Sequence, residues 1–199
     1  MKFVAKDAKP EAAAKETYTY GDYLAWPDGE RWELIDGVPY NMSPAPSRSH
    51  QEISRELLVQ FAVYLKDKTC RVYAAPFDVR LPKGDEEDAR VDTVVQPDLV
   101  VYCDRDKLDE RGARGAPDLA IEILSLYTAV KDMKIKRDLY ERVKVREFWL
   151  VDPGNKTVQV YALGEDGRYG RPEVYAGGDQ VKVGIFEDLT IDLAAVFKE

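Results

Sequence analysis

Two stretches of the sequence decide the fold: PDLVVY (residues 97–102) and LAIEIL (residues 119–124). Each is an apolar run rather than an alternating pattern, which is typical of a central strand covered on both faces. Each run also carries one acidic residue, Asp98 in the first and Glu122 in the second. A buried carboxylate is costly to desolvate unless a positive group lies against it. Two such carboxylates on neighbouring strands therefore predict a bound cation and metal-dependent hydrolysis.

The length and composition are those of one globular domain. The chain has 199 residues, of which 45% are hydrophobic, enough for a substantial core. Its apolar runs are too short to span a bilayer, and its first residues lack the hydrophobic segment of a secretory signal. We therefore expect a cytoplasmic protein without a membrane partner.

The metal-ligand inventory favours hard cations. The two cysteines do not form a CxxC pair, and His50 is the only histidine, so a structural zinc site has too few soft ligands. A metal must then be held mainly by oxygen, which favours Mg²⁺ or Mn²⁺. The net charge of −8 argues against broad electrostatic capture of nucleic acid, although a local basic groove remains compatible with it.

The pattern of elements predicts an α/β or α+β domain with a mixed sheet. Residues 1–16 are small and charged and should form a flexible arm, followed by a single domain over residues 17–199. Asp36-Gly37 is typical of a two-residue hairpin turn, and Ser49 with Glu52 has the spacing of a capping box. The expected helices are 19–24, about 49–67 and 129–143, and the expected strands are 32–35, 38–40, 72–81, 93–103, 119–124, 147–151, 157–163, 173–175, 180–183 and 190–193. A charged loop is expected over residues 104–117.

The helix expected at residues 129–143 carries charge on its apolar face. At about 100° per residue, Asp132 and Lys136 fall on the side of Leu139, whereas Lys134 falls on the opposite side. Asp132 and Lys136 are four residues apart, so they can form an ordinary helical ion pair. A charged pair that faces the core, toward Glu122, nevertheless favours a functional site.

These segments, taken in order, resemble the Uma2 family of restriction-endonuclease-like proteins, which is assigned to the PD-(D/E)xK nuclease superfamily. The resemblance covers residues 17–195. It rests on ELIDG (33–37), His50, QPDL (96–99), APDLAIEILS (116–125), Asp132 with Lys136 and Tyr140, and EFWLVDP (147–153). It implies a restriction-endonuclease-like mixed central sheet flanked by helices, with additional antiparallel C-terminal strands, together with Mg²⁺ binding and hydrolysis of DNA.

The superfamily pattern places an Asp on one strand and Glu-x-Lys on the next, because the lysine polarises the attacking water beside the metal. Here Leu124 occupies the lysine position. The family resemblance implies a lysine displaced onto the following helix, and the helical face analysis independently selects Lys136 over Lys134. Asp98 and Glu122 would then hold the metal with the main-chain carbonyl of Ile123, and Lys136 would act on the nucleophile or the phosphate.

Supporting roles are less defined by the sequence. Glu33 is either an exposed strand residue or an additional carboxylate on the metal side. His50 either caps and packs the helix or contacts phosphate, and Tyr140 should pack with its hydroxyl toward the site. The sequence departs from the family pattern at two places, which alter the ends of a loop and a helix. It has Ser125-Leu126-Tyr127-Thr128 in place of Ser-Pro-Ser-Thr, and it has Lys144 near the position of a usual glycine.

The sequence therefore predicts a divalent-metal-dependent endonuclease that hydrolyses DNA phosphodiester bonds. One alternative is a non-enzymatic nucleic-acid-binding or interaction module with a disused site. The other is a metal-dependent hydrolase of small phosphoesters, which suits the acidic net charge. A basic open cleft would favour a polynucleotide, and a closed pocket would favour a small ligand. The resemblance is also consistent with a homodimer, since many nucleases of this type cut two strands with two subunits.

Overall fold

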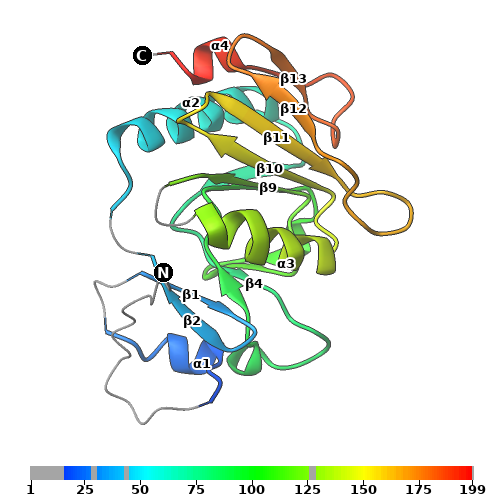
Figure 1. The fold of residues 1–199 in the computed structure, drawn as a ribbon. Coiled ribbons are helices and arrows are strands. Elements are labelled where there is room, and N and C mark those ends of the chain that lie inside the picture. Colours follow the sequence, from blue (N-terminus) through cyan, green and yellow to red (C-terminus); the bar gives the residue numbers. More distant parts are fainter. Residues whose placement is uncertain (1–15, 28–30, 43–44, 126–128, 199) are drawn as a thin grey trace.

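A computed structural model describes residues 16–27, 31–42, 45–125 and 129–198, which include two six-stranded sheets, a separate strand pair and several helices (Figure 1). The arm predicted for residues 1–16 lies outside this part of the chain, apart from Glu16. No helix within the described residues is both long and apolar enough to cross a membrane. The predicted mixed α/β architecture is confirmed.

The first sheet has the order β2-β1-β5-β4-β8-β7, and the second has the order β12-β11-β10-β9-β6-β3. The first is formed by β1 (Trp32–Ile35), β2 (Val38–Asn41), β4 (Val79–Arg80), β5 (Val94–Val95), β7 (Leu108–Asp109) and β8 (Gly112–Arg114). The second is formed by β3 (Arg71–Ala74), β6 (Leu99–Tyr102), β9 (Leu119–Ile123), β10 (Glu147–Asp152), β11 (Thr157–Ala162) and β12 (Glu173–Ala176). The remaining pair is β13 (Gln180–Lys182) with β14 (Thr190–Asp192).

The helical elements are α1 (Tyr20–Tyr23), α2 (Arg48–Leu65), the π-helix η3 (Lys131–Lys136), α3 (Arg137–Arg142), α4 (Leu193–Val196) and the 3₁₀ turns η1 (Asp88–Arg90) and η2 (Arg105–Lys107). The apolar stripe predicted for α2 is buried against the second sheet. Its N-cap is Ser47, whose side chain accepts from the backbone N–H of His50, so the cap that the sequence predicts at Ser49 is two residues late.

The second sheet separates two hydrophobic clusters, because successive strand residues point to opposite faces. Leu99 and Ile121 pack on the side of α2 and the C-terminal elements. Val100 and Ala120 pack on the side of α3 and the first sheet. Figure 1 shows this layering, with α2 and α4 beyond one side of β9 and β10, and α3 with β1 and β4 beyond the other. The alternation places Glu122 on the face of α3.

Two strands that the sequence predicts as continuous are each divided between the sheets. Residues 72–81 form β3 and β4, and residues 93–103 form β5 and β6, with one member of each pair in each sheet. Pro76 and Pro97 lie at these crossings, and proline has no N–H to donate to a strand ladder. The second crossing ends at Asp98, immediately before β6.

The segment expected as a charged loop, residues 104–117, contains regular secondary structure that the sequence did not predict. This segment contains η2 and the antiparallel pair β7–β8, and β8 continues the first sheet beside β4. Gly112 adopts φ +122°, and a Cβ there would lie 2.2 Å from the carbonyl oxygen of Asp78, so only glycine fits this close approach. Elsewhere, Cys70 and Cys103 form a disulfide across the ends of β3 and β6.

Helix α3 ends in a left-handed residue that is not glycine. Lys144 adopts φ +64°. Its N–H donates to the carbonyl of Glu141, and the N–H of Val145 donates to the carbonyl of Tyr140, which together form a Schellman motif. The glycine that the family pattern places near this point would adopt this conformation without the steric cost of a Cβ.

We predict that Lys144→Gly is more stable than Lys144→Ala by about 1 kcal/mol, because glycine has no Cβ and adopts the left-handed conformation without steric strain. Both variants lose the hydrogen bond from Lys144 Nζ to the Gly167 carbonyl, so their difference isolates the backbone effect. Urea unfolding followed by circular dichroism measures it. Equal stability of the two variants would contradict the prediction.

Candidate active site

A buried ion cluster forms where β1, β9 and η3 meet. The Lys136 side chain is 1% exposed, and its Nζ lies 2.6 Å from Glu33 Oε1 and 2.8 Å from Glu122 Oε1. Burial would lower the pKa of Lys136, but the charges of Glu122 and Glu33 outweigh it and raise the pKa well above its usual value. Lys134 is exposed, so the predicted choice of Lys136 as the inward-facing lysine is confirmed.

Glu122 is also held by the hydroxyl of Tyr140. This hydroxyl donates to Glu122 Oε1 at 2.7 Å, and Tyr140 is fully buried. The predicted inward orientation of Tyr140 is therefore confirmed. With both Tyr140 and Lys136 bound to one oxygen, the Glu122 side chain has a fixed orientation.

Asp98 lies across from Glu122 in the second sheet. Strands β6 and β9 are antiparallel with Leu99 opposite Ile121, so the register extended by one residue pairs Asp98 with Glu122. Residues opposite each other in such strands point to the same face. Asp98 Oδ2 accepts a hydrogen bond from the backbone N–H of Ile123 at 2.7 Å and so continues the ladder beyond β6. The extended register places both residues at the same end of two adjacent strands, as the sequence predicts, and their binding of one ion stays a prediction.

His50 reaches the same point from the first turn of α2. Its Nε2 lies 3.2 Å from Asp98 Oδ2. Burial would lower the pKa of His50, but the hydrogen bond and charge of Asp98, together with the Ile123 backbone, raise it above its usual value. His50 Nδ1 is buried and has no hydrogen-bond partner within the part of the chain that the structure describes. His50 is therefore a partner of Asp98, and its contact with phosphate stays a prediction.

Glu33 is fully buried, so its interpretation as an exposed strand residue is wrong. Its Oε2 accepts from Lys131 Nζ at 2.6 Å, and its Oε1 accepts from the backbone N–H of Gln96 at 2.9 Å in addition to Lys136. Burial alone would raise the pKa of Glu33, but the charges of Lys136 and Lys131 lower it to about 2.

The helical ion pair between Asp132 and Lys136 is not the main interaction of this lysine. Asp132 is buried, but its Oδ1 lies 3.8 Å from Lys136 Nζ, farther than either glutamate. Lys136 is thus held mainly by Glu33 and Glu122, from two different sheets. Asp132 adds negative charge on the same side.

Sequence reasoning missed Lys131, because a regular α-helix would not direct it toward Lys136. The predicted helix over residues 129–143 is present, but its residues Lys131–Lys136 form a π-helix, which is followed by α3. π-helices are rare and concentrate at functional sites. The one sequence signal was the closely spaced lysines at 131, 134 and 136, which periodicity alone cannot sort correctly.

The cluster contains more carboxylates than ammonium groups. Glu33, Glu122 and Asp132 lie around Lys136, and Glu33 also binds Lys131. Asp98 pairs with His50 and adds negative charge near Glu122. Burial raises the pKa of Glu122 well above its usual value, and the charges of Asp132 and Asp98 add to this effect while Lys136 opposes it. A hard cation would offset the excess negative charge, so the donor chemistry fits Mg²⁺ or Mn²⁺.

The same residues limit how such a cation is held. Within the described residues, no group of three or more His, Cys, Asp and Glu side chains is arranged to hold a metal. An ion would therefore depend on Asp98 and Glu122 together with a main-chain oxygen, for which the carbonyl of Ile123 is the candidate.

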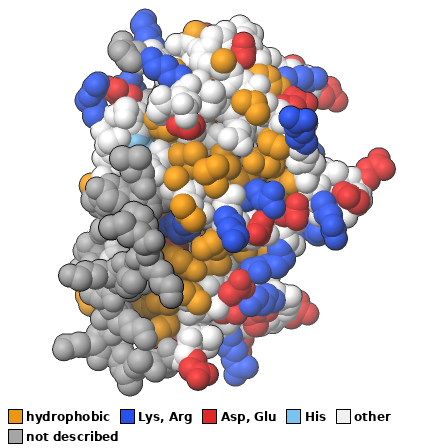
Figure 2. Space-filling view, in the orientation of Figure 1, with side chains coloured by type: hydrophobic (Ala, Val, Ile, Leu, Met, Phe, Trp, Pro, Cys, Tyr) orange, Lys and Arg blue, Asp and Glu red, His pale blue; other side chains and the backbone are white. Residues whose placement is uncertain are grey.

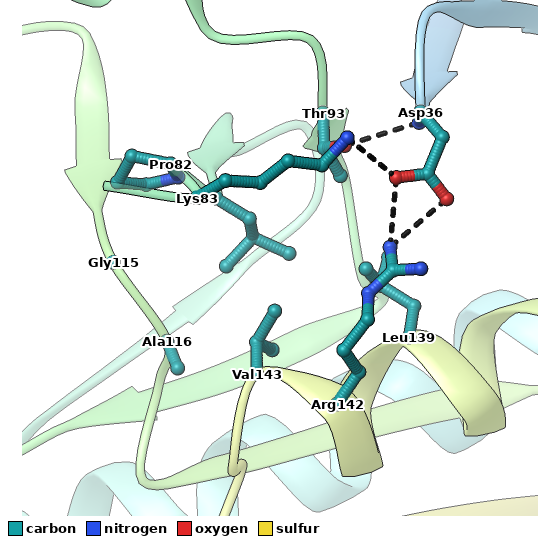
Figure 3. A pocket seen from close by; sticks show the side chains of 10 residues that line it. Asp36, Pro82, Lys83, Thr93, Gly115, Ala116, Leu139, Arg142 and Val143 are labelled. Carbon is teal, nitrogen blue, oxygen red and sulfur yellow. Dashed lines mark hydrogen bonds and ion pairs between the residues drawn. The ribbon is translucent and has the colours of Figure 1, made fainter. Parts of the chain in front are cut away.

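A pocket of about 460 Å³ lies between α3 and the first sheet (Figure 3). Leu139 of α3 and Val143, which follows that helix, form part of its apolar wall. Arg142 Nη2 lies 2.9 Å from both carboxylate oxygens of Asp36, and Lys83 Nζ lies 3.1 Å from Asp36 Oδ1. The Lys83 and Arg142 side chains are about half exposed, so solvent reaches both cations.

This pocket and the ion cluster use two of the same elements, although none of the cluster residues lines the pocket. Asp36 follows Glu33 by three residues in the β1–β2 hairpin, and Arg142 follows Lys136 by six residues on the helix. At 1.5 Å per residue, six residues correspond to roughly 9 Å along the axis of an α-helix. The hairpin and the helix therefore each contribute residues to both the pocket and the cluster.

Comparison with known proteins identifies the same group of proteins. A family model described as "Uma2: Putative restriction endonuclease" matches residues 20–194. A crystal structure from Anabaena variabilis, described as "a putative nuclease belonging to DUF820", has 23% identity and a TM-score of 0.71, over 90% of this chain and 97% of that chain. At this identity the likeness shows the fold. No curated protein matches the chain.

We predict that the destabilisation caused by Glu33→Gln depends on pH. The pKa of Glu33 is lowered from 4.5 to about 2 on folding, so its stabilising contribution is complete above pH 4.5 and is lost as the pH falls toward 2. The free energy of unfolding of Glu33→Gln should be lower than that of the wild type by about 3 kcal/mol near neutral pH, because two buried ammonium groups lose their shared carboxylate.

This difference should shrink as the pH falls through that range. Urea unfolding of both proteins across it provides the measurement, with exposed Glu110→Gln as a control that should change little at any pH. A difference that stays constant or grows toward acid pH would show that Glu33 is not held as a carboxylate.

Proposed function

Because this chain belongs to the Uma2 family, we propose that it is a divalent-metal-dependent endonuclease that hydrolyses phosphodiester bonds in DNA. The observation that supports this most strongly is the convergence of Asp98, Glu122 and Lys136 from two strands and a helix. Burying these charged groups costs free energy, and a disused site gives no reason to retain them. This favours an enzyme over a binding module.

The proposed roles follow from the positions of the groups. Asp98, Glu122 and the carbonyl of Ile123 would hold Mg²⁺ or Mn²⁺, which when bound lowers the pKa of a water molecule and offsets negative charge on the phosphate. The Lys136 ammonium would donate hydrogen bonds to the nucleophile or to a phosphate oxygen. Tyr140 would keep Glu122 in one orientation, since its hydroxyl already binds Oε1.

The surface favours local rather than broad contact with DNA. On the face drawn in Figure 2, Lys and Arg side chains lie among Asp and Glu side chains, consistent with the net charge of −8. The open pocket presents Lys83 and Arg142, each about half exposed and paired with Asp36, as candidate contacts for a flanking phosphate of a bound strand. A small phosphoester has no flanking phosphate, so a role for these cations would favour a polynucleotide substrate.

Variants of the three central residues should separate metal binding from chemistry. Asp98→Ala and Glu122→Ala are expected to abolish Mg²⁺- or Mn²⁺-dependent DNA cleavage and to weaken Mn²⁺ binding in calorimetry. Lys136→Ala should retain Mn²⁺ affinity and lower kcat by roughly 100-fold or more, because the ammonium acts on the reacting groups and is not a ligand. Lys134→Ala, on the exposed side of the same turn, is the matched control and should behave as the wild type.

Two results would favour the alternatives. A wild-type protein that binds no divalent ion and cuts neither single- nor double-stranded DNA would be better described as a binding module. One that binds metal and hydrolyses only bis-p-nitrophenyl phosphate would be a small-phosphoester hydrolase.

The pocket provides a separate test of substrate class. Lys83→Ala and Arg142→Ala should each raise KM for a DNA oligonucleotide by roughly fivefold, because each loses a charge-assisted contact with phosphate. Neither should change hydrolysis of bis-p-nitrophenyl phosphate, which carries no flanking phosphate for these cations to bind. Equal effects on the two substrates would exclude the pocket as a contact for a flanking phosphate.

A further inference from the structure

Lys131 lies beside the proposed catalytic residues. Among the described residues, it forms no hydrogen bond or ion pair with Glu122 or Asp98. Its Nζ is 2.6 Å from Glu33 Oε2, and its side chain is only 12% exposed. The other oxygen of Glu33 lies 2.6 Å from Lys136 Nζ. One fully buried carboxylate therefore bridges two ammonium groups.

The π-helix η3 makes this arrangement possible. Lys131 and Lys136 are five residues apart, and in an α-helix at about 100° per residue their side chains would point roughly 140° apart. Hydrogen bonding from i to i+5 in a π-helix instead places residues five apart nearly above one another. Since η3 begins at Lys131 and ends at Lys136, both lysines reach Glu33.

Glu33 and Glu122 share the ammonium of Lys136. Its ammonium is bound to Glu33 at 2.6 Å and to Glu122 at 2.8 Å, so the two carboxylates compete for one cation. Without Lys131, the fully buried Glu33 would have only Lys136 as a cationic partner among the described residues. An uncompensated carboxylate in a low-dielectric interior attracts its remaining cation strongly. Lys136 would then be held toward Glu33 and away from Glu122.

We propose that Lys131 is a positioning residue: by neutralising Glu33, it leaves the ammonium of Lys136 available beside Glu122. The inference rests on the proposed function, which assigns Lys136 to the nucleophile or the phosphate. It goes further by assigning a role to a second lysine, which acts through Glu33 and not through the DNA.

Steady-state cleavage of a DNA oligonucleotide with Mg²⁺ tests this role. Lys131→Met should lower kcat roughly tenfold or more and leave KM nearly unchanged, as expected for loss of a group that orients a catalytic residue. Lys131→Arg keeps the charge and should restore most of kcat. Exposed Lys134→Met, three residues along the same helix, should match the wild type. A raised KM with unchanged kcat in Lys131→Met would mean direct contact with DNA and would overturn the proposal.

The double variant Glu33→Gln/Lys131→Met tests whether Lys131 acts through Glu33. When Glu33 is neutral, Lys131 has no carboxylate to compensate, so adding Lys131→Met to Glu33→Gln should cost little further activity. If Lys131→Met lowers kcat by the same factor in both backgrounds, Lys131 acts independently of Glu33 and the proposal is wrong.

Urea unfolding of the same four proteins, without DNA or metal, measures the interaction independently of catalysis. The loss of stability in the double variant should be smaller than the sum of the two single losses, because each single change already breaks the same ion pair. If the stability losses are non-additive but the wild-type protein cuts no DNA, the proposed function is overturned, and so is the positioning of Lys136 for catalysis. DNA cleavage without coupling would overturn the assignment of Lys131 alone.

Discussion

The ammonium of Lys136, buried between Glu33 and Glu122, is the interaction on which the rest of the structure depends. An ammonium that is almost fully removed from water is tolerated only when carboxylates replace its hydration. Its two closest carboxylates come from β1 in the first sheet and β9 in the second, so the cluster requires both sheets to meet beside η3. The fold and the candidate site therefore depend on each other, because displacing β1, β9 or η3 would leave a buried charge without a partner.

The segment Gln96-Pro97-Asp98 fixes the sheets relative to each other at this point. The backbone N–H of Gln96 donates to Glu33 in the first sheet, and the side chain of Asp98 accepts from the N–H of Ile123 in the second. Pro97, between them, cannot donate to either ladder, and the chain changes sheet there. Three consecutive residues therefore join the sheets and place the Asp98 carboxylate across from Glu122.

The position of the lysine shows that chemistry constrains the location of a group in space more than its place in the sequence. In the superfamily pattern the lysine lies two residues after the glutamate on the same strand, a position that Leu124 occupies here. Lys136 reaches Glu122 from the following helix, with its amine 2.8 Å from the carboxylate. A buried charged group needs a defined orientation and compensation of its charge, and different backbone elements can supply both.

The sequence by itself determined the buried strand at Leu99–Tyr102, the hairpin at Asp36 and the inward-facing Lys136, because turn chemistry and side-chain periodicity are local properties. Only the tertiary structure decided that Glu33 is buried and that Lys131 binds it. These two residues are 98 positions apart, and their contact depends on how the first sheet packs against η3. The π-helix, which turns Lys131 toward Glu33, departs from the α-helical period. A prediction of side-chain directions from that period therefore could not place Lys131 beside Glu33.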